Sequence, residues 1–462
     1  MSLSDDINKT STSLANIKNA IIAKGTTPSG DITTYAAAIG DITTVENENK
    51  TVSPSTTQQS VTHSAGKTGL GTVIVNAVTS AIDSQIKPEN IKKNVEILGI
   101  VGSYEGDTVR SPEVVCSRST TWYLTSSGEL FGCGANTNGQ QGSGNTVNVT
   151  TFTKRADNVV EVRCSGEDVS SNSTTWYVNE SGELYGCGYG TYGQQGSGDT
   201  VDVTTFTKRA DNVKQIACSY RTTWYINESD ELYGCGNNLY GQQGSGSISF
   251  RESTFTKRAE NVKQVACSDS TTWYVNESGE LYGCGNNSNG QQGGGSSSTT
   301  TFTKRADNVK QVACSEDTTW YINESGELYG CGDNRSGQQG SGEKGEGTDV
   351  LTFTKRADNV KYVACAVHPN DASGVTWYIN ENNELYGCGE GAPQGSGYTA
   401  DVTTFTKRAD NVKQVACSDY TTWYITNDSG WSLPSLYGCG VNNKGQQGSG
   451  DTTSVLVFTR KN

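Results

Sequence analysis

The sequence is poor in several residue types, and each shortage excludes a class of protein. Its 462 residues include one methionine, seven prolines and two histidines, His63 and His368. Two isolated histidines supply no repeated general base, and closely spaced cysteine pairs are missing, so we predict no zinc site. No run of 18 or more apolar residues occurs, and we therefore expect no membrane span. The start, MSLSDDINKTS, has no cationic segment before an apolar core, so we expect no secretory signal.

Positive charge is also scarce. The chain has 35 Lys and Arg against 49 Asp and Glu, a net charge of −14. Because a surface that binds phosphates usually carries a basic excess, we predict no nucleic-acid partner. No nucleotide-binding glycine loop, HExxH motif or nucleophile elbow occurs. The sequence therefore predicts a protein that is not an enzyme, with no catalytic residues, no cofactor and no bound metal.

Glycine is abundant, with 55 residues, and it marks a tandem repeat. A clear copy begins at Asn261 with NVKQVACSDSTTWYVNESGELYGCGNNSNGQQGGG and closes with TFTKRADN. Three markers occur seven times in the same order: a Cys-Ser or Cys-Ala pair, a TTWY-type motif and a Gly-Cys-Gly motif. The tryptophans of the second marker are Trp122, Trp176, Trp224, Trp273, Trp320, Trp377 and Trp423.

Each copy predicts four short strands. In the copy above they cover 263–267, 271–276, 280–284 and 301–304, and the second is rich in Thr, Trp, Tyr and Val. Four strands at a period of roughly 50 residues are typical of a propeller blade. We therefore predict an all-β, seven-bladed β-propeller over residues 111–462. Because the chain ends in VFTRKN with no unit after it, we expect residues 457–460 to pair with the first blade and close the ring.

The segment CSDSTTWYVNESGELYGCGNNSNGQQG resembles the repeat of the regulator-of-chromosome-condensation family, with matching spacing from Cys267 to Gly293. The resemblance extends over about residues 111–462 and implies a seven-bladed propeller. This chain departs from the family pattern in three ways: Thr271 replaces its histidine, Cys284 its tryptophan, and GQQG its GQLG. The sixth copy is also shortened, to GCGEGAPQGSG. The family includes an exchange factor for a small GTPase and an inhibitor of β-lactamases, so the resemblance does not fix the function.

The first hundred residues follow another pattern. Leu14, Ile17 and Ile21 have helical spacing and predict a helix over 12–24; a second helix is expected between Ser29 and Gly40. After a polar stretch, GTVIVNAV and NVEILGIVGSYEG predict strands. We thus predict a helical attachment segment over 1–44 and a small β-rich module or linker over 45–106, together a mixed α/β region ahead of the propeller.

Three phrases of this region look like modules of bacteriophage tail and other virion-associated proteins, which precede variable C-terminal domains there. They are IKNAIIAKGTTPSGDITTYAAAIGDI, VSPSTTQQSVTHSAGKTGLGTVIVNAV and IKPENIKKNVEILGIVGSYEG. The resemblance implies an attachment segment followed by a display domain.

The repeated side chains each allow a structural and a functional interpretation. Two cysteines per blade could form disulfides, bind zinc or pack as free thiols; strand two would separate them, which favours buried free thiols. The TTWY tryptophans could stack on sugars, but a repeated strand aromatic favours packing between blades. The Lys-Arg pair of FTKRAD could hold an acidic ligand, or be a solvated lysine beside an arginine paired with a carboxylate. The paired glutamines are expected to satisfy backbone groups where blades meet.

Segments that vary between copies are better candidates for binding, because irregular loops on a regular scaffold form binding faces. Insertions occur at 166–172, 247–253, 343–350 and 366–374 and around Trp431. The first, the fourth and that of Trp431 fall between strands one and three, and the others precede strand four, so we expect them on different faces. The candidate binding residues are Asp168, Asn172, Phe250, Arg251, His368, Asn370 and Trp431.

Two functions from different classes fit these observations. The first is a bacteriophage virion structural protein, a tail or head fibre or decoration located in the virion. It would attach to other virion proteins through residues 1–106, bind a host-surface glycan or protein through propeller loops, and form a homo-oligomer. The alternative is a cytoplasmic protein-interaction propeller that regulates a partner enzyme or GTPase. A propeller lyase or hydrolase is the least favoured third class.

Overall fold

The computed structural model describes residues 112–166, 173–367, 374–397, 399–418, 420–427 and 434–461, together with Asn16 and four short strands before them. By its internal contacts the chain forms two compact units, Met1–Val109 and Arg110–Asn462. In the first unit β1 (Gln59–Val61) pairs with β2 (Val73–Val75), and β3 (Glu96–Ile97) pairs with β4 (Ile100–Val101). Strands β2, β3 and β4 lie within segments predicted as strands. The predicted helices lie outside the described residues, apart from Asn16, which is helical.

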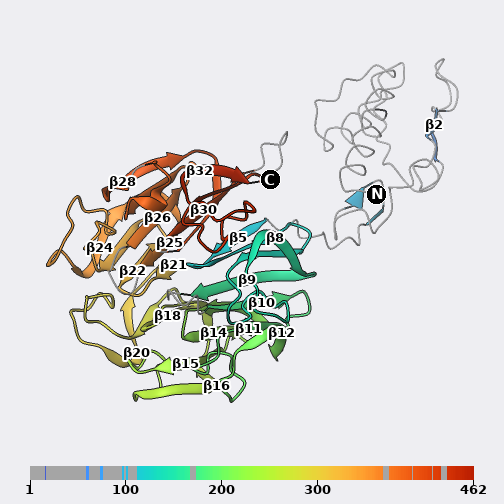
Figure 1. Cartoon of the computed structure of the whole chain (residues 1–462). Helices are drawn as coiled ribbons and strands as arrows, with labels where there is room; N and C mark the ends of the chain where they lie inside the picture. Colours follow the sequence, from blue (N-terminus) through green and yellow to red (C-terminus); the bar gives the residue numbers. More distant parts are fainter. Residues whose placement is uncertain are drawn as a thin grey trace. The chain divides into compact units, whose positions relative to one another are not determined.

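The second unit contains seven four-stranded antiparallel sheets, each made of four consecutive strands. Figure 1 shows that these sheets follow one another in chain order around a ring, from β5 in cyan to β32 in red. The last sheet contacts the first through β29 and β30 against β5. The seven-bladed propeller that the repeat predicts is therefore confirmed.

The four strand positions recur in every blade, and β-strand residues alternate with tight glycine- and asparagine-rich turns. The first strands are β5 (Glu113–Cys116), β9 (Val159–Gly166), β13 (Val213–Cys218), β17 (Val262–Cys267), β21 (Val309–Cys314), β25 (Val360–Val367) and β29 (Val412–Cys417). The second strands are β6 (Thr120–Leu124), β10 (Ser173–Asn179), β14 (Thr222–Asn227), β18 (Thr271–Asn276), β22 (Thr318–Asn323), β26 (Gly374–Asn380) and β30 (Thr421–Thr426).

The third and fourth strands complete each sheet, and the fourth lies at its outer edge. The third strands are β7 (Leu130–Gly134), β11 (Leu184–Gly188), β15 (Leu232–Asn238), β19 (Leu281–Gly285), β23 (Leu328–Gly332), β27 (Leu385–Gly389) and β31 (Leu436–Gly440). The fourth strands are β8 (Val149–Ala156), β12 (Val203–Ala210), β16 (Ser249–Ala259), β20 (Thr299–Ala306), β24 (Val350–Ala357), β28 (Val402–Ala409) and β32 (Val455–Lys461). A short 3-10 helix, η2 (Ala392–Gln394), stands in the shortened sixth copy.

Each TTWY tryptophan packs between two blades. Trp273 on β18 lies opposite Gly283 on β19, and a Cβ atom added to this glycine would meet the indole ring at 2.5 Å. The ring also meets Phe353 of the next blade edge-to-face, with centroids 6.0 Å apart; such a pair contributes about 0.5–1.5 kcal/mol beyond its burial. All seven of these tryptophans are fully buried, which confirms that they pack in the core.

The ring closes without the shared sheet that we expected. Strand β32 pairs with β31, with Leu436 opposite Lys461 and Gly438 opposite Thr459, so the last strand completes the last blade. Every copy already contains four consecutive strands, and the first copy, which also ends in its own FTKR strand, leaves no position for β32. Closure depends instead on side chains that bridge neighbouring blades and on an isolated backbone contact, in which the Gly450 amide donates to the Thr150 carbonyl at 3.0 Å.

These bridges are glutamines that bond like a backbone peptide. At the closure, Gln414 Oε1 accepts from the Val114 amide at 3.0 Å and its Nε2 donates to the Val114 carbonyl at 3.2 Å. Gln264 binds the amide and carbonyl of Val312 in the same way, both at 3.0 Å. The seventh and first blades are therefore joined as two consecutive blades are.

Candidate binding face

Two sets of connections leave the propeller from one face, which we call the upper face. Because neighbouring strands are antiparallel, the connections from first to second strands and from third to fourth strands lie at this face. The strand ends that flank 167–172 and 368–373 therefore share it with the β15–β16 connection, whereas β30 and β31, which flank Trp431, are joined at the opposite face. We expected the insertions at 166–172 and 366–374 on a different face from those that precede a fourth strand. That expectation is wrong for these two insertions.

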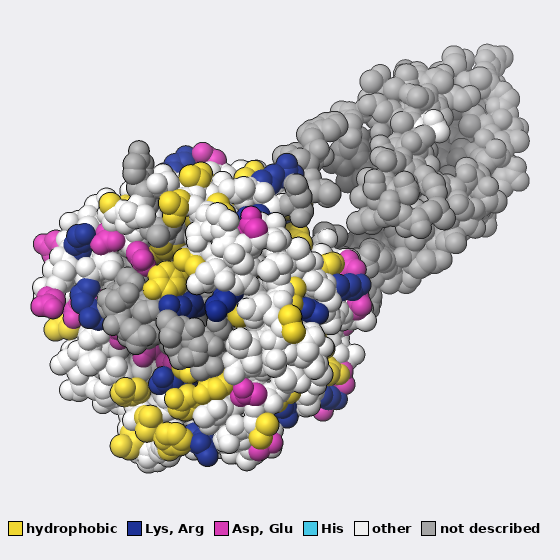
Figure 2. Space-filling view, in the orientation of Figure 1, with side chains coloured by type: hydrophobic (Ala, Val, Ile, Leu, Met, Phe, Trp, Pro, Cys, Tyr) yellow, Lys and Arg dark blue, Asp and Glu magenta, His cyan; other side chains and the backbone are white. Residues whose placement is uncertain are grey.

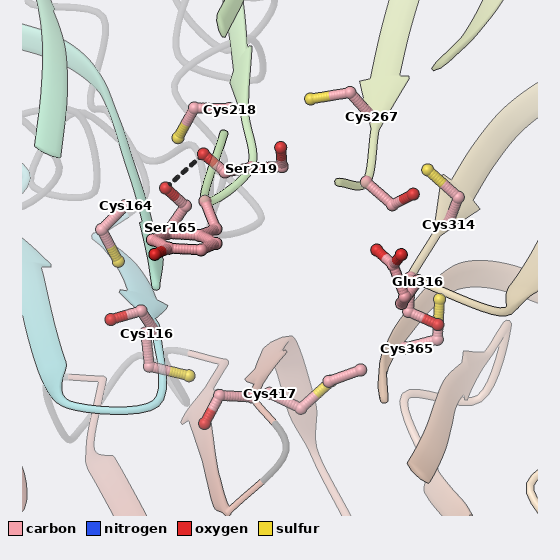
Figure 3. A pocket seen from close by; sticks show the side chains of 16 residues that line it. Cys116, Cys164, Ser165, Cys218, Ser219, Cys267, Cys314, Glu316, Cys365 and Cys417 are labelled. Atoms are coloured by element: carbon pink, nitrogen blue, oxygen red, sulfur yellow. Dashed lines mark hydrogen bonds between the residues drawn. The ribbon is translucent and has the colours of Figure 1, made fainter. Parts of the chain in front are cut away.

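The first strands line a central channel, and seven thiols form a ring in it (Figure 3). A chamber of about 150 Å³ lies on the upper-face side of this thiol ring, and one of about 320 Å³ extends below it along the strands. The thiol ring consists of Cys116, Cys164, Cys218, Cys267, Cys314, Cys365 and Cys417.

None of the seven thiols of the ring forms a disulfide. Burial raises the pKa of Cys218 and of Cys365 to about 12, and a thiol, unlike a thiolate, is a poor nucleophile and metal ligand. Within the described part of the chain, no group of three or more His, Cys, Asp or Glu side chains could hold a metal ion.

The second cysteine of each blade connects blades. Cys187 Sγ donates to the Gln140 carbonyl of the preceding blade at 3.4 Å, and Cys133 Sγ makes the same contact with Gln446 across the closure at 3.6 Å. None of the cysteines from Cys116 to Cys439 forms a disulfide, as predicted. The third-strand thiols are buried, as predicted, whereas the first-strand thiols of the ring are only half-buried.

The paired glutamines have divided roles. Gln242 Nε2 donates to the Asp269 carbonyl of the next blade at 2.7 Å, and Gln243 Nε2 donates to the Cys235 carbonyl of its own blade at 2.9 Å. In this pair the first glutamine satisfies a backbone group of the next blade, as predicted, whereas the second bonds within its own blade. At Gln291 and Gln292, for which the prediction was made, Gln291 Nε2 contacts Asp317 Oδ1 at 3.4 Å and the Gln292 side chain has no hydrogen-bond partner among the described residues, so the prediction is wrong there.

The contacts of the Lys-Arg pair differ in part from those expected for a structural role. The half-exposed Lys304 pairs with Glu280 and Asp307, each at 2.6 Å, so here the lysine, rather than the arginine, bonds the carboxylates. Arg258 does pair with a carboxylate, that of Glu252. Exposed pairs such as those of Lys304 contribute at most about 1 kcal/mol each.

An aromatic cluster of Tyr189, Tyr192, Tyr220 and Phe250 lies on the upper face across the second and third blades. Tyr189 stacks on Tyr220 with ring centroids 5.6 Å apart, and Tyr192 lies 6.0 Å from Tyr220 and 6.1 Å from Phe250. The Arg221 guanidinium lies 4.9 Å from the centre of the Tyr192 ring and 5.0 Å from that of Tyr220. The cluster thus joins aromatic rings to a cation.

Exposed apolar side chains adjoin this cluster along the chain. Phe250 is 54% exposed, and Leu239, Tyr240 and Ile248 of the same β15–β16 segment are 45%, 46% and 67% exposed. Figure 2 shows hydrophobic side chains gathered with a basic group near β16, at the lower edge of the view. Apolar side chains that gather on a surface in this way mark contact sites more often than scattered ones do.

Two of the predicted binding residues belong to this surface. Phe250 is part of the cluster, and the Arg251 guanidinium lies 5.1 Å from the centre of its ring. Both lie on β16 rather than on a loop, with Arg251 opposite Asn237, because β15 continues to Asn238 and extends the ladder. The other five predicted residues, Asp168, Asn172, His368, Asn370 and Trp431, lie outside the described residues.

The sequence prediction did not include Tyr189, Tyr192, Tyr220, Leu239 or Tyr240. The sequence does contain a signal for them, because the fourth copy has polar residues at the equivalent positions. In the same order, these are Asn286, Asn289, Asp269, Ser288 and Asn289. The prediction considered inserted segments, whereas these residues are substitutions in stretches where the copies align without gaps.

Three carboxylates form an acidic margin on the upper face beside the channel: Asp269, Glu316 and Asp317. Burial raises the pKa of Asp317 to about 6 and that of Glu316 well above its ordinary value, and neighbouring carboxylates add to both shifts. Arg221 Nε lies 3.5 Å from Asp269 Oδ2, and Arg335 lies 2.7 Å from Asp333 and 3.9 Å from Asp317. Glu316 Oε2 is inaccessible to solvent and has no hydrogen-bond partner among the described residues.

The order of the blades and the repeat define this protein as a seven-bladed propeller, and three of its repeats match a known family model. Residues 213–242, 262–291 and 309–338 match the regulator of chromosome condensation (RCC1) repeat. The second region to match contains the Cys267, Trp273 and Cys284 markers on which the sequence resemblance rests. Three of the seven copies therefore match the RCC1 repeat.

Solved structures share this fold at low sequence identity. Human WBSCR16 is 18% identical, with a TM-score of 0.60 over 72% of this chain and 93% of its own. Prp20p from Saccharomyces cerevisiae is 18% identical, with a TM-score of 0.59 over 72% and 86% of the two chains. Yeast RCC1 (Prp20) with bound Kap60 is 17% identical, with a TM-score of 0.61 over 80% and 91%. In the described part of this chain no helix has the length and apolar character needed to span a membrane.

Proposed function

We propose that this protein is a non-enzymatic protein-interaction propeller that binds a partner protein through its upper face. The aromatic cluster carries the proposal. Tyrosine and arginine are enriched among the residues that dominate protein–protein affinity, and here they gather with exposed Phe250 and Tyr240. The corresponding positions of the fourth copy hold Asn, Asp and Ser, so this patch is an addition to the scaffold rather than part of it.

The structural relatives support an interaction role. Prp20p has been characterised for its binding to Gsp1p and histones, and yeast RCC1 has been solved with Kap60 bound. The channel supports a role without catalysis, because its most prominent nucleophilic atoms are thiols with a raised pKa. These observations favour the interaction propeller that the sequence presented as its alternative.

The bacteriophage virion role, with its virion location, virion and host-surface partners and homo-oligomeric state, stays a prediction. It depends on residues 1–106, of which the structure describes only Asn16 and the strands β1 to β4. Regulation of an enzyme or GTPase is equally a prediction.

Restoring the repeat residues tests the proposed function. Tyr192→Asn with Phe250→Ser gives this surface the residues that the fourth copy has at Asn289 and Ser297. The matched control is Val147→Ser in the first blade, which occupies the position equivalent to Phe250 and is 69% exposed. Tagged full-length protein would be used to capture partners, and each captured protein would then be purified and its Kd measured.

We expect the double variant to weaken binding of the physiological partner at least about tenfold, or 1.4 kcal/mol, and the control to bind like the wild type. Circular dichroism should be the same for all three proteins. Partner binding that is unchanged in the double variant would refute the assignment of the upper face.

A further inference from the structure

We propose that the partner inserts a basic side chain, lysine or arginine, into the channel mouth beside the aromatic cluster, where it pairs with Glu316. This inference rests on the proposed function and specifies the chemistry of the partner segment: a basic residue next to apolar ones. Three observations carry it: the size of the upper chamber, the state of the Glu316 carboxylate and the position of Tyr220.

The upper chamber has the size for a side chain. Its volume is about 150 Å³, below the roughly 300–1,000 Å³ of pockets that take up drug-sized ligands. Cysteine thiols and serine hydroxyls form most of its wall, and Glu316 is the one charged side chain among its described lining residues. Figure 3 shows the Glu316 carboxylate directed from one side into the channel.

The Glu316 carboxylate has no counter-ion of its own. Its Oε2 atom is inaccessible to solvent and lacks a hydrogen-bond partner among the described residues. Asp269 and Asp317 add like charge, and Arg221 offsets this only in part. The nearby cations already contact other carboxylates, since Arg221 lies beside Asp269 and Arg335 beside Asp333. Burial and this like charge favour the neutral, protonated form of Glu316 in the free protein. An incoming ammonium or guanidinium group would supply the opposite charge that favours the ionised form and would pair with it.

Tyr220 connects this chamber to the aromatic cluster. It lines the chamber and stacks on Tyr189, 5.6 Å away between ring centroids. A basic side chain that reached Glu316 would thus pass an aromatic ring, which attracts cations, while the neighbouring partner residues lay against Tyr192 and Phe250. One continuous surface therefore offers apolar contact outside and negative charge inside.

Other occupants fit this chamber less well. An anion would face Glu316 and the like charge of Asp269 and Asp317. A metal ion would need a ligand group that the described residues do not form. A neutral sugar could stack on the tyrosines, but would supply no opposite charge to the Glu316 carboxyl.

Selection of peptides by the full-length protein tests the inference. Random linear peptides displayed on phage would be selected on the wild type, and the strongest binder would be synthesised together with a version in which glutamine replaces its basic residue. The variants are Glu316→Gln and the control Glu277→Gln, an exposed glutamate in the β18–β19 turn on the opposite face. Fluorescence polarisation gives Kd for each pair, and thermal unfolding verifies that both variants fold.

We expect the wild type to select peptides with a lysine or arginine next to apolar residues. Glu316→Gln should weaken the basic peptide at least about tenfold, Glu277→Gln should not, and the neutral peptide should bind the wild type and Glu316→Gln alike. Equal affinity of the basic peptide for the wild type and Glu316→Gln, or selection of peptides without basic residues, would overturn the inference and leave the proposed function standing. Selection of no peptides would also overturn it. The partner-capture experiment, which does not depend on Glu316, tests the proposed function separately.

Discussion

Replacing Arg163 by alanine tests how charge in the channel contributes to stability. Arg163 lies on β9 where most first strands have alanine, as at Ala266 and Ala416. Its Nη1 atom is 2.6 Å from Glu113 Oε1 and its Nη2 atom is 2.8 Å from Glu161 Oε1. Nη1 also donates to the Val162 carbonyl at 2.7 Å. In other blades the equivalent carbonyl accepts a hydrogen bond from a glutamine side chain, such as that of Gln264. In the first blade Glu113 takes the place of this glutamine, and an ionised carboxylate has no hydrogen to donate.

Arg163→Ala removes the positive charge that pairs with two channel carboxylates, those of Glu113 and Glu161. Removing one partner of a buried ion pair costs about 3–5 kcal/mol. Because Arg163 and Glu113 are 33% and 23% exposed, we expect about 3 kcal/mol at alkaline pH, near the lower end of that range.

The loss should depend on pH. Burial raises the pKa of Glu161 to about 7 from an ordinary 4.5. A raised folded-state pKa means that the contribution of this carboxyl to stability is complete below 4.5 and is lost as pH rises through about 7. Without Arg163 that pKa rises further, so the cost of the substitution should be large above neutrality and shrink on acidification.

A triple variant provides the matched control. Glu113→Gln and Glu161→Gln together with Arg163→Ala restore the usual repeat residues, and each new glutamine can bond the next blade as Gln414 bonds Val114. Urea unfolding at acidic and alkaline pH, followed by tryptophan fluorescence, measures all three proteins. The triple variant should lie within about 1 kcal/mol of the wild type. A single variant as stable as the wild type at alkaline pH, or equally destabilised at both pH values, would refute the reasoning.

Three further predictions concern the scaffold. Gly283→Ala should lower stability by about 1–3 kcal/mol, because its Cβ would overlap the Trp273 ring; an unchanged unfolding temperature would contradict this. Cys218 and Cys365, whose pKa burial raises to about 12, should react slowly with a disulfide reagent in the native protein and rapidly in urea, and fast native labelling of both would count against protonated thiols. Deleting residues 455–461 should shift tryptophan emission to the red, because Phe458 packs 6.0 Å from Trp377 of the sixth blade; emission that stays unshifted would contradict the role of β32 in covering that ring.

The repeat made most of the fold predictable. The markers at Cys267, Trp273 and Cys284 lie on the first, second and third strands of the fourth blade, as predicted. Such patterns are local, because alternation and turn residues are properties of adjacent positions. The partner of the last strand was not predictable in this way: the motif VFTRKN identifies a strand but not the sheet it joins, and the prediction for it was wrong.

The candidate site was predicted only in part, for a related reason. Phe250 and Arg251 were identified because their segment differs in length from the other copies. Tyr189, Tyr192 and Tyr220 come from two connections of neighbouring blades, and only the packing of those blades brings their rings within about 6 Å of one another.

By itself, the sequence determined the number of blades, the strands within them and the burial of the tryptophans and of the third-strand cysteines, because each follows from residues close together in one copy. The tertiary structure alone decided how the ring closes, which side chains meet at the channel mouth and which carboxylate stands there without a counter-ion. Those properties depend on distances between separate blades, and a distance through space is set only when the sheets pack.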